Sequence, residues 1–132
     1  MLRARRLSPI RSLGELVTYQ DPCYLGRYNR LYREPREVLL SIPGLELVEM
    51  ERSGSKALCC GAGGGAAWIN VFGGQRVNYM RLEEAADLGV TTVATACPLC
   101  KMMLCDAVGY HHLESSLRIK DIAELLLEAQ PE

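Results

Sequence analysis

Five of the six cysteines in this 132-residue chain follow a pattern that can do chemistry. Cys59 and Cys60 are adjacent, Cys97 and Cys100 form a C-x2-C pair, and Cys23 lies 35 residues upstream of the adjacent pair. In a reducing compartment, thiols are more often metal ligands or redox centres than halves of structural disulfides. The spacing predicts that these five sulfurs meet in space.

The adjacent pair favours a cofactor with more than one metal atom. Neighbouring side chains diverge, so Cys59 and Cys60 reach two irons of one cluster more easily than they converge on a single tetrahedral ion. Zinc takes four ligands and would leave one of the five cysteines over. The pattern therefore points to iron and inorganic sulfide.

A glycine run follows the adjacent pair and includes Gly61, Gly63, Gly64 and Gly65. Residues without a Cβ let the backbone approach a bulky inorganic core and donate N–H groups to its sulfides, so we expect these glycines to shape the cofactor pocket. The same run, Gly61-x-Gly63-x-x-Ala66, also matches a loose dinucleotide fingerprint. Because the nearest predicted strand ends near Met50, nucleotide binding is the weaker interpretation.

The Cys97-x-x-Cys100 pair is ambiguous by itself. At the start of a helix the free amide groups favour the thiolate, which suits a dithiol redox centre and half of a metal site equally well. Two other functions therefore stay open: a zinc-binding structural or regulatory module, and a metal-free thiol–disulfide protein that uses Cys97 and Cys100. We expect the sixth thiol, Cys105, to pack as a small apolar residue.

Strands and helices alternate along the chain. Apolar patterns predict strands over 16–19, 45–50 and 90–96, and helices over 24–40, 66–88, from Pro98 onward, and over 121–129. Gly73-Gly74 is expected to break or kink the helix over 66–88. This order predicts an α/β fold with a small parallel sheet flanked by helices on both faces. Ligands of such sheets lie beyond the carboxyl ends of the strands. Since Cys23 and Cys97 directly follow predicted strands, the cysteines are expected at that edge.

Further expectations concern individual aromatic, histidine and charged side chains. Trp68 is expected in the core, and His111 and His112 at the surface. The helical spacing of Arg76, Arg81, Glu83 and Glu84 predicts a solvated, ion-paired helix face.

Composition limits the classes of partner. The formal net charge is -1, so no overall positive field attracts nucleic acid, and no apolar run approaches the roughly 20 residues that span a bilayer. With no apolar segment typical of a signal peptide near the start, we expect a cytoplasmic protein. Residues 1–14 are predicted to form a basic N-terminal arm and residues 15–132 a single cysteine-rich domain.

The pattern resembles the cysteine-rich CCG domain of heterodisulfide reductases and of the iron–sulfur subunits of glycolate oxidase and glycerol-3-phosphate dehydrogenase. The matching runs are Asp21-Pro22-Cys23-Tyr24-Leu25-Gly26-Arg27, Cys59-Cys60-Gly61-Ala62-Gly63-Gly64-Gly65 and Ala96-Cys97-Pro98-Leu99-Cys100. The resemblance implies one four-iron cluster, cubane or non-cubane, that serves electron transfer or disulfide reduction. In the non-cubane form all five cysteines, Cys23, Cys59, Cys60, Cys97 and Cys100, would be ligands.

The resemblance also implies partners. These are a flavoprotein or another iron–sulfur subunit, in the cytoplasm or at the cytoplasmic face of a membrane complex. Longer family members carry two such domains, so a site between domains would require a second copy of this chain or a partner subunit. Gln20 stands where the family commonly has histidine before Asp-Pro-Cys.

Overall fold

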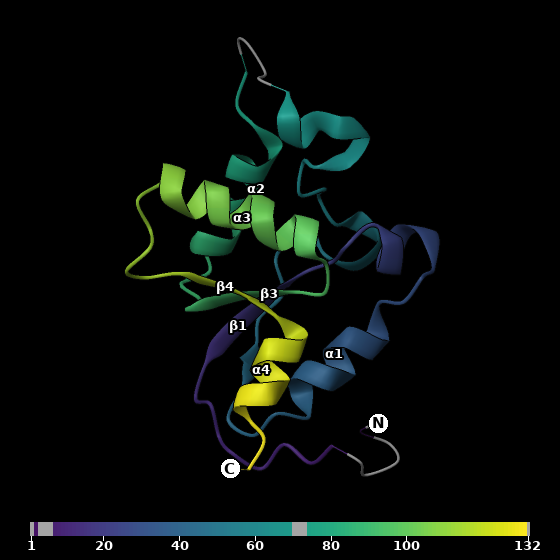
Figure 1. The fold of residues 1–132 in the computed structure, drawn as a ribbon, viewed down its shortest axis with the longest axis vertical. Coiled ribbons are helices and arrows are strands. Elements are labelled where there is room, and N and C mark those ends of the chain that lie inside the picture. The colour runs from purple at the N-terminus through teal and green to yellow at the C-terminus, as the bar shows by residue number, and fades with distance from the viewer. Residues whose placement is uncertain (1, 3–6, 70–73, 132) are drawn as a thin grey trace.

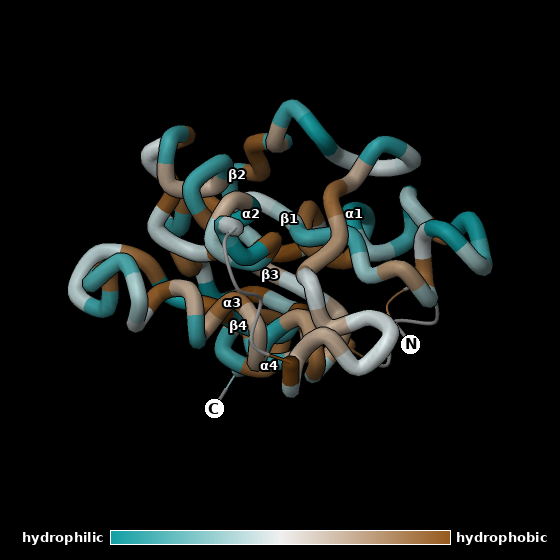
Figure 2. Tube along the Cα trace, turned by 90° about the horizontal axis from the view of Figure 1, so that it is seen from above, coloured by the Kyte–Doolittle hydropathy of each residue, from teal (hydrophilic) through white to brown (hydrophobic). Residues whose placement is uncertain are grey.

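Four parallel strands form the centre of the protein in a computed structural model that describes residues 2, 7–69 and 74–131. In sheet order they are β2 (Glu46–Leu47), β1 (Leu16–Gln20), β3 (Thr92–Thr95) and β4 (Arg118–Asp121), each parallel to its neighbour (Figure 1). Figure 2, viewed from above, shows the strands in the same order. The predicted α/β fold with a small parallel sheet is confirmed.

Helices cover both faces of this sheet. One face carries α1 (Arg33–Leu40) and α4 (Ile122–Glu128), and the other carries α2 (Val77–Ala86) and α3 (Pro98–Tyr110) (Figure 1). Alternate residues of β1 serve the two faces: Val17 and Tyr19 pack with α1 and α4, whereas Thr18 and Gln20 point the other way. All four side chains are buried, as expected for a central parallel strand.

The helix predicted over 66–88, with a break or kink at Gly73-Gly74, forms only in its second part. Residues Gly63–Trp68 form 3₁₀ turns, and α2 begins at Val77; residues 70–73, which include Gly73, lie outside the described part of the chain. Ile69 is extended, with φ of −108° and ψ of 126°, so no continuous helix runs on from Ala66. Trp68 is 76% exposed, and the expectation that it belongs to the core is wrong.

One strand is shorter than predicted, and another strand was not predicted. The alternating run over 45–50 pairs with β1 only at Glu46–Leu47. Strand β4 was not predicted, because three of its four residues are polar. It lies at the edge of the sheet, where such residues are common. At its end Asp121 forms a capping box with Glu124 that starts α4.

The segment before β1 is attached to the far end of α4. The backbone N–H groups of Ile10 and Arg11 donate to the carbonyl of Ala129 at 2.9 and 3.0 Å. The division of the chain at residue 14 into an arm and a domain stays a prediction.

In the described residues, no helix combines the length and the apolar character that crossing a membrane requires.

A partly buried acid, Glu15, at the amino end of the sheet makes stability depend on pH. Burial would raise the pKa of Glu15, but the hydroxyl of Thr92 at 2.7 Å and the charges of Lys120 and Arg118, each at 3.1 Å, lower it overall. A carboxylate with a lowered pKa stabilises the fold above its unfolded-state pKa, and this contribution is lost as the pH falls through the folded pKa.

We therefore expect Glu15→Gln to lower the free energy of unfolding by about 1 kcal/mol at pH 7. The difference between variant and wild type should shrink as the pH falls through the lowered pKa of Glu15, because the wild-type carboxyl group is then protonated as well. Urea unfolding at several pH values measures it. A difference that stays constant across this range would contradict the assignment.

Candidate functional site

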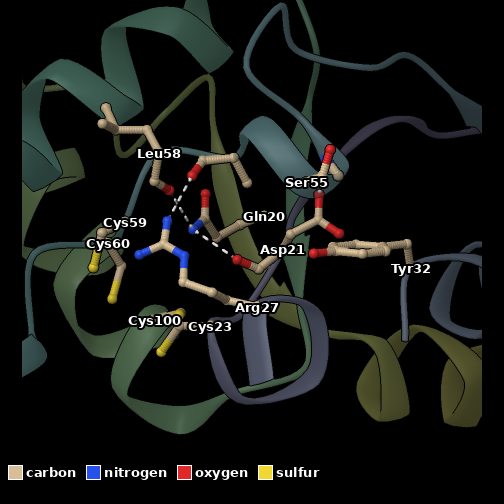
Figure 3. Close-up of a pocket in the computed structure, with 12 residues that line it drawn as sticks. Gln20, Asp21, Cys23, Arg27, Tyr32, Ser55, Leu58, Cys59, Cys60 and Cys100 are labelled. Atoms are coloured by element: carbon tan, nitrogen blue, oxygen red, sulfur yellow. Dashed lines mark hydrogen bonds between the residues drawn. The ribbon is translucent and has the colours of Figure 1, made fainter. Parts of the chain in front are cut away.

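A small cavity of about 20 Å³ lies beyond the carboxyl end of β1, and four of the predicted cysteines line it (Figure 3). They are Cys23, Cys59, Cys60 and Cys100. Cys23 follows β1 directly, and Cys100 lies in the first turn of α3. Cys97 is the N-cap residue of α3 and packs in the same cluster as Cys60 and Cys100. The structure thus brings all five cysteines together at one edge of the sheet.

The buried thiols form a polarised pair. A hydrogen bond from the Cys100 thiol lowers the pKa of Cys60 to about 6 against the opposing effect of burial, with help from the backbone N–H of Ala62 and from Cys59. The pKa of Cys100 is correspondingly raised, by that bond and by its own burial. Cys60 is therefore the group in this pair that carries the negative charge. Metal ligation requires the thiolate form.

The four glycines of the predicted pocket differ in their backbone conformation and hydrogen bonds. The N–H of Gly61 donates to Sγ of Cys59 at 3.3 Å, and its φ of +87° favours glycine. Gly64 and Gly65 also have left-handed φ angles, whereas Gly63 does not. None of the four lines the described cavity, so their contact with a cofactor stays a prediction.

The arrangement of the donors bears on the kind of metal centre. In the described part of the chain, no three histidine, cysteine, aspartate or glutamate side chains converge closely enough to hold one ion. A polynuclear cluster instead distributes its cysteine ligands over several metal atoms. The five thiols approach from three separate segments, around residues 23, 59–60 and 97–100, and this donor set fits an iron–sulfur cluster better than a single zinc ion.

Two buried residues at the end of β1 hold the loop that leads to Cys59. The carboxylate of Asp21 accepts two hydrogen bonds from Arg36 of α1, both of 2.8 Å, and one from the N–H of Gly54, also of 2.8 Å. The amide of Gln20 donates to the carbonyl of Leu58 at 3.1 Å. Gly54 and Leu58 are therefore fixed against the strand that delivers Cys23, which sets the position of the adjacent cysteines.

Arg81 of α2 supports this loop from the other face. Its side chain is fully buried, and Nε donates to Oε1 of Gln20 while Nη1 donates to the carbonyl of Arg52 at 2.8 Å and to Glu84 at 2.9 Å. Burial would raise the pKa of Glu84, but the N–H of Arg52 and the charge of Arg81 lower it overall. The predicted solvated face of α2 is therefore wrong at Arg81.

Sequence reasoning assigned no role to several residues around the cavity. Asp21, Arg27 and Tyr32 line it together with the cysteines (Figure 3). Nη2 of Arg27 donates to the carbonyl of Ala57 at 3.4 Å. The positions of Asp21 and Arg27 near Cys23 were the available signal, but both contact residues far along the chain. Cys105, by contrast, is exposed, so the prediction that it packs as an apolar residue is wrong.

Comparison with known proteins relates the site to one family and to several longer proteins. The CCG family, described as a cysteine-rich domain, matches residues 17–105. The probable iron-sulfur-binding oxidoreductase FadF of Bacillus subtilis is 41% identical over 129 residues, which cover 98% of this chain and 18% of that protein. A probable membrane-anchored ferredoxin of Chromohalobacter salexigens is 43% identical over 98% of this chain and 19% of its own length.

A third relative is named for the reduction of a disulfide. It is one subunit of the dihydromethanophenazine:CoB--CoM heterodisulfide reductase of Methanosarcina barkeri, and it is 36% identical over 98% of this chain and 31% of its own length. The chain thus spans less than a third of the length of each of these three relatives.

The buried position of Arg81 can be tested by mutation. We expect Arg81→Met to lower the free energy of unfolding by about 1–3 kcal/mol, because Oε1 of Gln20 and the carbonyl of Arg52 lose their donor while Glu84 keeps only Arg52 as a partner in the described part of the chain. Chemical denaturation measures the loss. Arg30→Met, at an exposed position, is the control and should change stability by less than about 0.5 kcal/mol. Equal effects of the two changes would refute the role given to Arg81.

Proposed function

We propose, from the premise that this chain belongs to the CCG family of cysteine-rich domains, that it binds an iron–sulfur cluster and transfers electrons as part of an oxidoreductase. One observation carries the proposal. Cys23, Cys59, Cys60 and Cys100 line a common cavity at the carboxyl edge of the sheet, and Cys97 packs beside the last two. Such a concentration of free thiols from three segments suits a cluster with several irons.

We assign the finer features of the site as follows. All five cysteines hold one four-iron cluster, and when bound this cluster supplies one-electron redox chemistry. Hydrogen bonds from the Cys100 thiol and the N–H of Ala62 lower the pKa of Cys60, which favours the thiolate form that binds metal. The N–H of Gly61 donates to Cys59 and so withdraws electron density from that sulfur, which favours the reduced state of a bound cluster. Gly63, Gly64 and Gly65 leave room for the cluster on the open side.

The names of the relatives suggest the setting. They are called an iron-sulfur-binding oxidoreductase, a membrane-anchored ferredoxin and a heterodisulfide reductase subunit. On that basis we propose that the chain exchanges electrons with a flavoprotein or another iron–sulfur subunit, with disulfide reduction as one reaction it can serve. A second CCG domain, or a second copy of this chain, is the partner we propose for completing the site.

Metal analysis of protein purified without oxygen separates this function from the two others. A brown protein with iron and acid-labile sulfide in near-equal amounts supports the proposal. A colourless protein with one zinc ion would establish the structural module instead. A metal-free protein that turns over disulfides would establish the thiol–disulfide enzyme. An electron paramagnetic resonance spectrum of the brown form would then distinguish cubane from non-cubane clusters.

Single cysteine variants test the ligand set. Cys59→Ser and Cys60→Ser should each lose the visible absorbance and most of the bound iron, because a serine hydroxyl is a poor replacement for a thiolate ligand. Cys105→Ser is the matched control, since this thiol is exposed and does not line the cavity, and it should keep the wild-type spectrum. An unchanged spectrum for the first two variants would refute the proposed ligands.

A further inference from the structure

The segment that follows β1 has an unusual composition for an exposed turn. Residues 23–33 include three arginines and three tyrosines and no acidic residue, although the whole chain has a net charge of -1. Tyrosine and arginine are the residues most enriched, with tryptophan, among those that dominate protein–protein binding. The segment is therefore a local basic and aromatic surface, which we call the Arg–Tyr turn.

The side chains of the Arg–Tyr turn face the solvent. Tyr24 and Tyr28 are each 71% exposed, and their rings lie 5.4 Å apart between centroids. Arg27 and Arg30 are exposed beside them, whereas Arg33, at the start of α1, forms an ion pair with Glu37 at 2.6 Å. Two large aromatic rings left in water are costly for an isolated protein, so this surface has the character of a binding site.

The backbone holds these side chains in a fixed arrangement. Residues Tyr24–Tyr28 form a π-helical turn in which the N–H of Tyr28 donates to the carbonyl of Cys23 at 3.0 Å, and the N–H of Arg30 then donates to the carbonyl of Gly26 at 2.7 Å. A Cβ at Gly26 would lie 2.7 Å from Cε1 of Tyr32, so the turn packs tightly against that ring. Arg30 itself has a φ of 57°, an uncommon value for arginine. A rigid surface of this kind loses little entropy when a partner binds.

The Arg–Tyr turn also forms part of the wall of the cysteine cavity. Cys23 is its first residue, and Arg27 lines the cavity with Cys59 and Cys60 (Figure 3). A protein bound to the turn would therefore stand at the rim of the cysteine site. Electron transfer between proteins needs this proximity of the docking surface to the redox centre.

We propose that the Arg–Tyr turn is the docking surface for an acidic electron-carrier protein, one with carboxylates arranged around its own redox centre. This inference rests on the function proposed above. Opposite charges steer the two proteins together and give a fast but short-lived encounter, while Tyr24 and Tyr28 supply apolar contact. In that encounter the reduced carrier loses the one electron that the bound cluster gains.

Stopped-flow reduction of the cluster-loaded protein by a chemically reduced, strongly acidic [2Fe–2S] ferredoxin tests the proposal. The bimolecular rate constant should fall as ionic strength rises, because salt screens the attraction. Arg30→Glu should lower the rate constant at low salt by about tenfold and flatten its dependence on salt. Tyr28→Ala should also lower the rate constant, at every ionic strength.

Arg11→Glu is the matched control for the charge reversal. Arg11 is exposed and precedes the amino end of β1, so it lies at the opposite edge of the sheet, yet its reversal changes the net charge by the same amount. It should leave the rate constant within about twofold of wild type. Iron content is measured for every sample, so that a slow variant with a full cluster reports on docking alone.

Three outcomes would overturn the docking surface. The first is a rate constant that does not depend on salt, and the second is an equal effect of Arg30→Glu and Arg11→Glu on that rate constant. The third is binding of a single-stranded oligonucleotide by the wild-type protein that Arg30→Glu abolishes, because nucleic acid would then be the partner. Failure of the proposed function looks different. If the proposed function fails, the wild-type protein holds no iron. If only the docking surface fails, the protein holds a cluster that the ferredoxin reduces without help from the Arg–Tyr turn.

Discussion

The end of β1 is the constraint on which the site depends. Gln20 and Asp21 are polar and almost fully buried there, so each needs hydrogen-bond partners. Arg81 reaches Gln20 from α2 on one face of the sheet, and Arg36 reaches Asp21 from α1 on the other. The same two residues bind the loop that leads to the adjacent cysteines. The folding of both layers and the position of Cys59 and Cys60 are therefore coupled through a single strand end.

The charges around the cavity suit an anionic cofactor. A cluster held by several thiolates carries negative charge, which a low-dielectric site tolerates only near compensating donors and cations. Arg36 and Arg81 are neutralised by Asp21 and Glu84 and act mainly as braces. Arg27 differs, because it donates to the neutral carbonyl of Ala57. Its charge can therefore act on a bound anion at the cavity mouth.

Sequence predicted the parts of this arrangement that depend on local pattern. The parallel sheet follows from alternating strands and helices, and the meeting of Cys23 with Cys97 and Cys100 follows from their places after β1 and β3. The first part of the helix predicted over 66–88 failed because apolar spacing does not reveal the extended backbone of Ile69. The burial of Arg81 was missed because its partner Gln20 lies 61 residues away, a contact that no local pattern encodes.

Partial exposure of the cysteines explains why the domain suits a larger assembly. Cys60 and Cys100 are buried, but Cys23, Cys59 and Cys97 each keep contact with solvent. A cofactor held by all five would therefore be buried at Cys60 and Cys100 and close to solvent at the other three cysteines. A redox group near the surface leaves a short path for electrons. The partner proposed above would meet the domain at this edge, where three of the five thiols reach solvent, and the chain spans less than a third of the length of these relatives.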